Sequence, residues 1–106
     1  MKIYVAGPYT KYDVAINVRN AVKMADKLAR RGHTPFVPHL THFWHIISPH
    51  TYEFWLEQDL EWLSVCDALI RLPGESDGAD KEVAYAVEHG IPVFYRLSDV
   101  PEEQSR

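Results

Sequence analysis

Four short apolar segments alternate with three helical patterns along this chain, and this alternation limits the folds it can adopt. The first segment, residues 3–6, is almost wholly apolar, and Gly7 and Pro8 end it. Such a segment suits a central parallel strand that is buried on both faces. We expect the other strands at residues 34–37, 68–70 and 91–95, and the helices at residues 14–31, 52–64 and 79–89. The pattern predicts an α/β fold with a doubly wound parallel sheet, flavodoxin-like or Rossmann-like.

The order of the strands places the predicted binding site. Right-handed crossovers and the commonest arrangement of such sheets give the strand order 2-1-3-4. Ligands then bind beyond the carboxyl ends of the strands, where the first and third strands diverge. The loop at Gly7, the loop at His39 and the turn at Ser76 are therefore expected to meet in one crevice.

The length of the chain fits one domain. Its 106 residues are 46% hydrophobic, so residues 1–106 are predicted to form a single unit with one core. Residues 99–106 are polar enough to be a flexible tail. Cys66 is the one cysteine, which excludes an intrachain disulfide and a cysteine metal site, and we interpret it as a small core residue.

Charge and hydropathy exclude several classes of partner. The net charge is −4 and there is no basic block, which argues against nucleic acid and anionic membranes as partners. No segment approaches the roughly 20 apolar residues of a membrane span, and the apolar run at the N-terminus is shorter than that of a secretory signal. We expect a cytoplasmic protein with a small-molecule partner and no cofactor.

A glycine-containing turn after the third apolar segment suggests an anion-binding site. Pro73, Gly74 and Gly78 interrupt regular structure before a helical pattern begins. The first backbone N–H groups of a helix lack partners and suit a phosphate or carboxylate, and Ser76 adds a hydroxyl. Glu82 is expected in the first turn, where the helix dipole favours its ionised form. The alternative is an ordinary capped helix with one acidic residue near its start.

Asp59 is the best partner for Glu82 in a catalytic pair. It lies beside the apolar stripe of its predicted helix, which is formed by Leu56, Leu60 and Leu63. A carboxylate in that position is either a solvated edge residue or a site residue. Two carboxylates across a cleft suit cleavage of an N- or O-glycoside: one attacks the anomeric carbon or stabilises its cation, and the other protonates the leaving group.

Residues 38–50 are predicted to form a loop that is rich in histidine and aromatic residues. Several imidazoles can hold zinc, but these histidines have no companion cysteine or nearby carboxylate in the loop, so no metal site is predicted. Phe43, Trp44 and His45 can instead stack on a nucleobase, and His39 could bond the sugar or the base. The alternative for Trp44 is a lid over the core or a dimer contact.

Several motifs together resemble the nucleoside 2-deoxyribosyltransferase superfamily. Residues 4–7, residues 57–63, Asp67 and the pattern from Ser76 through Gly78 to Glu82 occur in the order and spacing of that family. The likeness covers about residues 1–95. Within the superfamily, the chain is most similar to the 2′-deoxynucleoside 5′-monophosphate N-glycosidases.

The resemblance implies roles for individual residues. Glu82 would be the nucleophile that attacks C1′, Asp59 would act as acid and base and contact the sugar, and Tyr4 would lie by the nucleophile. The substrate would be bound by Gly7, His39, Ser76 and Gly78. Transferases of free nucleosides carry an aspartate where this chain has Ser76, whereas the monophosphate hydrolases carry a serine that bonds the phosphate.

The loop after the first strand departs from the hydrolases. Thr10 stands where they have an arginine that holds the phosphate, so a charge-assisted contact is missing. Arg19, Arg71 or a partner subunit could supply the cation.

We therefore expect hydrolysis of the N-glycosidic bond of a (deoxy)nucleoside 5′-monophosphate. The alternatives are a nucleoside 2-deoxyribosyltransferase and a non-catalytic nucleotide-binding module. The resemblance also implies a homodimer, and aromatic enrichment at interface cores points to Trp44, Phe54 and Trp55 as its contacts.

Overall fold

A computed structural model describes residues 1–102 of the chain. Its strands are β1 (Lys2–Ala6), β2 (Thr34–Phe36), β3 (Ala68–Arg71) and β4 (Val93–Phe94). Its α-helices are α1 (Val14–Arg30), α2 (His42–Ile47), α3 (Tyr52–Ser64) and α4 (Asp77–Glu88), and two 3-10 helices are η1 (Pro38–Thr41) and η2 (Leu97–Asp99). No helix within these residues is long and apolar enough to cross a bilayer.

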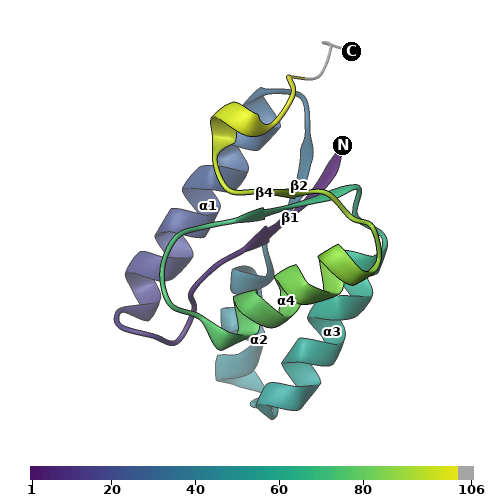
Figure 1. Cartoon of the computed structure of the whole chain (residues 1–106). Helices are drawn as coiled ribbons and strands as arrows, with labels where there is room; N and C mark the ends of the chain where they lie inside the picture. Colours follow the sequence, from purple (N-terminus) through teal and green to yellow (C-terminus); the bar gives the residue numbers. More distant parts are fainter. Residues whose placement is uncertain (103–106) are drawn as a thin grey trace.

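The strands form one parallel sheet in the order β2-β1-β3-β4, which confirms the predicted α/β fold and strand order (Figure 1). β1 is central, with Tyr4 paired to Phe36 of β2 and to Leu69 of β3. Pro35 is tolerated because β2 is an edge strand, where a missing N–H donor costs little. All four carboxyl ends lie at the same edge, so the segments that follow the strands gather there.

The helices cover both faces of the sheet, with α1 on one face and α3 and α4 on the other (Figure 1). Successive side chains of a strand point to opposite faces. Ile3 and Val5 of β1 pack on the α1 side with Ala21, Ala25 and Leu28. Tyr4 and Ala6 pack on the other side with Leu63, Ala79 and Ala86. The continuous apolarity of β1 is explained by this burial on both faces.

Side-chain caps fix the starts of the three long helices. Asp13, Thr51 and Ser76 each accept a hydrogen bond from the backbone N–H three residues further on, and such caps stabilise a helix by about 1 kcal/mol. The cap at Ser76 starts α4 at Asp77, two residues before the predicted start. Glu82 therefore lies in the second turn of α4, and its predicted place in the first turn is wrong.

Two other segments are more ordered than the sequence predicts. Residues 38–50, predicted as a loop, contain η1 and α2. The predicted flexible tail from Asp99 is wrong for Val100, whose side chain is 2% exposed and belongs to the core on the α1 side. The carbonyl of Pro101 also bonds His33 Nε2 at 2.6 Å. The rest of that tail, residues 103–106, lies outside the described residues. Cys66 is partly buried at the margin of the core beside α3.

Candidate active site

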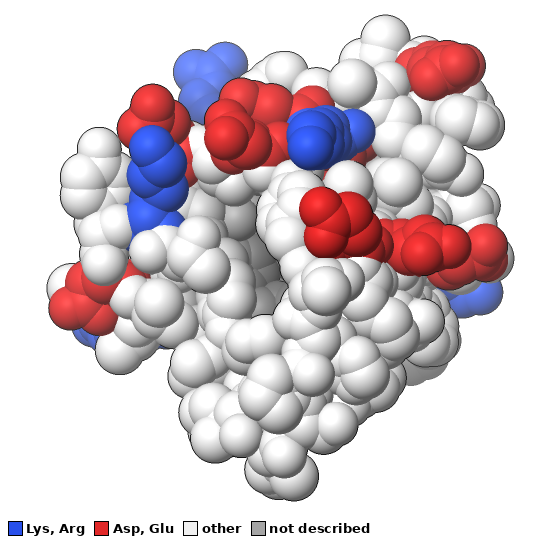
Figure 2. Space-filling model, turned by 90° about the horizontal axis from the view of Figure 1, so that it is seen from below, with Lys and Arg blue, Asp and Glu red and all other residues white. Residues whose placement is uncertain are grey.

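A cavity of about 640 Å³ opens at the carboxyl edge of the sheet. Figure 2 shows the hollow from below, with charged side chains gathered on one side of it and an uncharged surface on the other. The walls come from the loop after β1, from η1 and α2, from the turn before α4, and from the N-terminal halves of α3 and α4. Six of the seven predicted site residues line the cavity: Gly7, His39, Asp59, Ser76, Gly78 and Glu82. The seventh, Tyr4, is fully buried behind Glu82.

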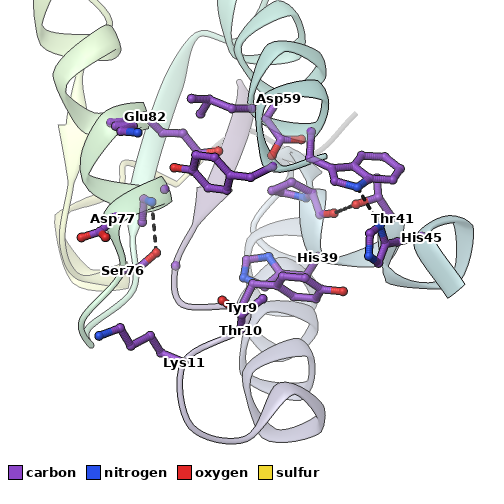
Figure 3. A pocket seen from close by; sticks show the side chains of 18 of the residues that line it. Tyr9, Thr10, Lys11, His39, Thr41, His45, Asp59, Ser76, Asp77 and Glu82 are labelled. Atoms are coloured by element: carbon purple, nitrogen blue, oxygen red, sulfur yellow. Dashed lines mark hydrogen bonds between the residues drawn. The ribbon is translucent and has the colours of Figure 1, made fainter. Parts of the chain in front are cut away.

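A carboxyl pair lies at the inner end of the cavity, where the partly buried Asp59 of α3 and the buried Glu82 of α4 approach one another (Figure 3). Glu82 is 5% exposed, and the hydroxyl of Tyr4 donates to its Oε2 at 2.5 Å. Ala79 and Ala86, both buried, allow α4 to lie close to the sheet. Strand β1 can therefore bring Tyr4 directly beneath the glutamate.

Burial controls the protonation of this pair. Burial raises the pKa of Asp59 to about 7, and the hydrogen bond with Glu82 offsets part of this rise. Burial likewise raises the pKa of Glu82 to about 8, and the hydrogen bond from Tyr4 offsets part of this rise. The pKa of Tyr4 is itself raised by burial and by the two carboxyls, so the phenol stays a donor. The pair thus keeps a proton near neutral pH, whereas the sequence had predicted an ionised Glu82 on the basis of the helix dipole.

Ser76 combines two roles at the start of α4. Its Oγ accepts from the N–H of Ala79 at 3.1 Å, so this lone pair is used by the helix. The hydroxyl hydrogen remains available to donate to a ligand, because Ser76 lines the cavity. The residue can therefore bond an oxygen of a sugar or of a phosphate without giving up its cap.

The two arginines proposed from the sequence do not supply a phosphate contact. Arg71 donates to the carbonyl of Leu72 and to Asp80 at 3.0 Å, and neither Arg71 nor Arg19 lines the cavity. Within residues 1–102, the lysine and arginine side chains at the cavity are Lys11 and Lys81. Neither lysine belongs to a motif that would have singled it out before the structure was known.

His39 lines the cavity with a ring that is almost fully buried. Its ring is 5% exposed, and its Nε2 donates to the carbonyl of Pro8 at 3.0 Å. Burial lowers its pKa, which favours the neutral ring with a lone pair on Nδ1. That Nδ1 has no hydrogen-bond partner among the described residues. A buried acceptor without a partner is costly, and a hydroxyl or N–H of a ligand would satisfy it.

An aromatic wall formed by His45, His50 and Trp55 lines the cavity. Tyr52 also lines it but lies beside Gly78 of α4, with Lys81 Nζ 4.9 Å from its ring centroid. The indole N–H of Trp55 donates to His45 Nδ1 at 2.8 Å, which leaves the hydrogen of a neutral His45 ring on Nε2. This wall can hold a nucleobase by stacking. Trp55 was missed as a site residue because its helical position reads as part of the apolar surface of α3.

Phe43 and Trp44 do not take the predicted stacking role. They are 62% and 45% exposed and do not line the cavity, whereas His45 does. Trp44 instead packs edge-on against Trp55, with ring centroids 4.8 Å apart. Residues 43–45 lie in helix α2, whose turn separates the side chains of Phe43 and Trp44 from that of His45. A predicted loop could not show this separation. No group of three or more His, Cys, Asp or Glu side chains in the described part of the chain could hold a metal ion.

The fold and this cavity define an α/β domain with a pair of carboxyls at the carboxyl edge of a parallel sheet. The chain belongs to the family described as a domain of unknown function, DUF7768, whose model matches residues 1–96. No curated protein matches the chain significantly.

Solved structures share the fold. A 2-deoxyribosyltransferase from Bacillus psychrosaccharolyticus is 25% identical, with a TM-score of 0.62 over 88% of this chain and 69% of that chain. A conserved protein from Enterococcus faecalis V583 is 21% identical, with a TM-score of 0.71 over 87% and 60%. A 2-desoxiribosyltransferase from Leishmania mexicana is 19% identical, with a TM-score of 0.63 over 87% and 61%. The chain therefore has the fold of nucleoside 2-deoxyribosyltransferases and spans 60–69% of the length of these proteins.

Proposed function

We propose that this protein transfers the 2-deoxyribosyl group of a nucleoside from one base to another by breaking and re-forming the N-glycosidic bond. The observation that supports this most strongly is the pair of the partly buried Asp59 and the buried Glu82, with Tyr4 behind it, at the inner end of a cavity with an aromatic wall. The similarity to the Bacillus psychrosaccharolyticus 2-deoxyribosyltransferase supports the same class of reaction.

In the first step the pair divides its roles. The shared proton passes from Glu82, which has the higher pKa, through the hydrogen bond between the two carboxyls to Asp59. Asp59 gives it to the departing nitrogen base, while the resulting Glu82 carboxylate bonds to C1′ as the C1′–N bond breaks. The hydroxyl of Tyr4 bonds the Glu82 carboxyl and so opposes part of the cost of an ionised glutamate in a buried place. The raised pKa of Asp59 suits a general acid near neutral pH.

In the second step an acceptor base replaces the departed base. Its nitrogen attacks C1′, the bond from C1′ to the Glu82 oxygen breaks, and Asp59 takes the proton that the acceptor loses. The two displacements return the pair to its starting protonation state. They also predict retention of configuration at C1′, since each displacement inverts it.

The walls of the cavity suit the rest of such a substrate. Trp55 would cover the face of the base, and His45 Nε2 would donate to its edge. The unused acceptor of His39 would take a hydrogen bond from a hydroxyl of the sugar or an N–H of the base. Ser76 would donate to the 5′ oxygen.

Hydrolysis of a nucleoside 5′-monophosphate is the second candidate. Ser76 favours it, because a neutral hydroxyl at a helix start does not repel a phosphate. The chemistry at Glu82 would be the same, with water as the acceptor in the second step. The two candidates differ in the acceptor and in the group on the 5′ carbon.

One experiment separates these functions. The protein is incubated with 2′-deoxynucleosides and with their 5′-monophosphates, each with and without a different free base, and the products are separated by chromatography. We expect a new nucleoside that requires the added base. Free base without a new nucleoside would instead support hydrolysis, and unchanged substrates throughout would overturn the proposal. Glu82→Gln should be inactive, whereas Glu88→Gln, on the exposed end of the same helix, should be fully active.

A further inference from the structure

An ion pair bridges two loops at the mouth of the cavity. Lys11, in the loop after β1, has its Nζ 3.0 Å from Oε2 of Glu75, in the turn before α4. Glu75 directly precedes Ser76, and Figure 3 shows Lys11 extending toward that turn. Thr10, where a phosphate-binding arginine was expected, is thus followed by a lysine whose charge is neutralised by a carboxylate.

The backbone around Lys11 is fixed by hydrogen bonds to α1, whereas the side chain of Lys11 is about half exposed to solvent. The side-chain amide of Asn17 donates to the carbonyls of Tyr9 and Lys11 at 3.0 and 2.7 Å, which ties the loop to α1. The side chains of Lys11 and Glu75 are 49% and 62% exposed. An ion pair with this exposure contributes roughly 0–1 kcal/mol, so a stronger anion can displace the glutamate.

The position of the Lys11–Glu75 ion pair indicates which end of the substrate it would contact. Asp59 and Glu82 mark the place of C1′, and the aromatic wall with His45 marks the place of the base. Lys11 and Ser76 lie on the side of the cavity away from His45 (Figure 3). On the proposed function, this is the side left for the 5′ carbon of the sugar and its substituent.

We propose that Lys11 and Glu75 together determine whether the 5′ substituent is a hydroxyl or a phosphate. While the pair is closed, Glu75 neutralises Lys11 and places a negative charge beside Ser76, so the site favours an uncharged 5′-hydroxyl. A 5′-phosphate gains the contact with Lys11 only by displacing Glu75. This inference rests on the proposed function, because it needs C1′ at Glu82.

Binding measurements on matched variants test the proposal. Calorimetry gives the affinities of 2′-deoxyadenosine and thymidine, and of their 5′-monophosphates, for the Glu82→Gln protein, in which turnover is blocked. The same measurements follow with Glu75→Gln added, with Asp77→Asn added, and with both Lys11→Gln and Glu75→Gln added. Asp77 is the matched control: it is the carboxylate on the other side of Ser76 and also lines the cavity, but the ion pair of Lys11 is with Glu75.

Glu75→Gln should improve monophosphate binding relative to nucleoside binding by about fivefold, the factor that corresponds to an exposed ion pair of about 1 kcal/mol. Asp77→Asn should change this ratio by less than half as much. The gain should vanish when Lys11→Gln is added, because the freed cation is then lost.

Equal effects of Glu75→Gln and Asp77→Asn, or a gain that survives the loss of Lys11, would overturn the inference. So would an unchanged ratio in Glu75→Gln. If the wild type still exchanges bases in any of these cases, the proposed function stands and only the role of the ion pair is wrong. If no ligand binds and no base is exchanged, the proposed function fails and this inference fails with it.

Discussion

Replacing Glu82 with glutamine should abolish turnover and also stabilise the folded protein at alkaline pH. Glu82 is 5% exposed, and burial raises its pKa from the ordinary value of 4.5 to about 8. The folded chain therefore holds a proton on this group that the unfolded chain has already released. Stability from this group is fully present below about pH 4.5 and is lost as the pH rises through about 8.

The size of the effect follows from the two pKa values. One pKa unit corresponds to about 1.4 kcal/mol, so a rise from 4.5 to about 8 corresponds to at most about 5 kcal/mol of unfolding free energy. A glutamine does not ionise, and its amide can still accept from Tyr4 and donate to Asp59. At pH 9, Glu82→Gln should therefore be more stable than the wild type by up to this amount, while at pH 4.5 the two should be nearly equal.

Urea unfolding of both proteins at half-unit steps from pH 4.5 to 9 measures this directly. The wild type should lose stability across the range and the variant should lose much less, the remainder coming from Asp59, whose pKa burial raises to about 7. Asp59→Asn combined with Glu82→Gln should flatten the curve further. A wild-type curve that is level from pH 5 to 8, or a variant that keeps the full slope, would refute the assignment of a buried proton to this pair.

Three further substitutions test the roles given to single side chains. Asp59→Asn removes the proton donor and should lower kcat by roughly 10²–10⁴-fold, with the loss smallest for substrates whose base departs easily; an equal loss for all bases would contradict its role as the acid. Tyr4→Phe removes the hydrogen bond that lowers the pKa of Glu82, so the rise of kcat/KM with pH should move to higher pH, and an unchanged profile would count against this link. Trp55→Ala should weaken binding of the base by about 1–3 kcal/mol if the ring stacks on it, whereas Trp62→Ala, on an exposed position outside the cavity, should leave substrate affinity as it is.

The fold could be predicted because its signals are local. Four apolar segments, the helical stripes between them and the glycines after them are readable one segment at a time, and right-handed crossovers then limit the order of the strands. The start of α4 was nevertheless placed two residues late. Helix boundaries depend on which residue caps, and Gly78 masked the start at Asp77.

The chemistry of the site was harder to predict from the sequence than the fold, because it depends on packing. The order and spacing of the motifs singled out Asp59 and Glu82, but their raised pKa values arise from burial between α3, α4 and β1, which no local pattern reveals. The cavity wall at Trp55 and the ion pair of Lys11 with Glu75 likewise depend on contacts between segments far apart in sequence. Polar residues on loops give no signal of the partner they will meet.

The covalent bond proposed between Glu82 and C1′ can be tested directly. The most direct measurement is to mix the wild type with a 2′-deoxynucleoside in the absence of an acceptor base, quench within a turnover with acid, and map the peptides by mass spectrometry. We expect one deoxyribosyl group on the peptide that contains Glu82, its loss on addition of an acceptor base, and its absence in Glu82→Gln. Base exchange without any such adduct, or an adduct on another residue that persists in Glu82→Gln, would contradict this proposal.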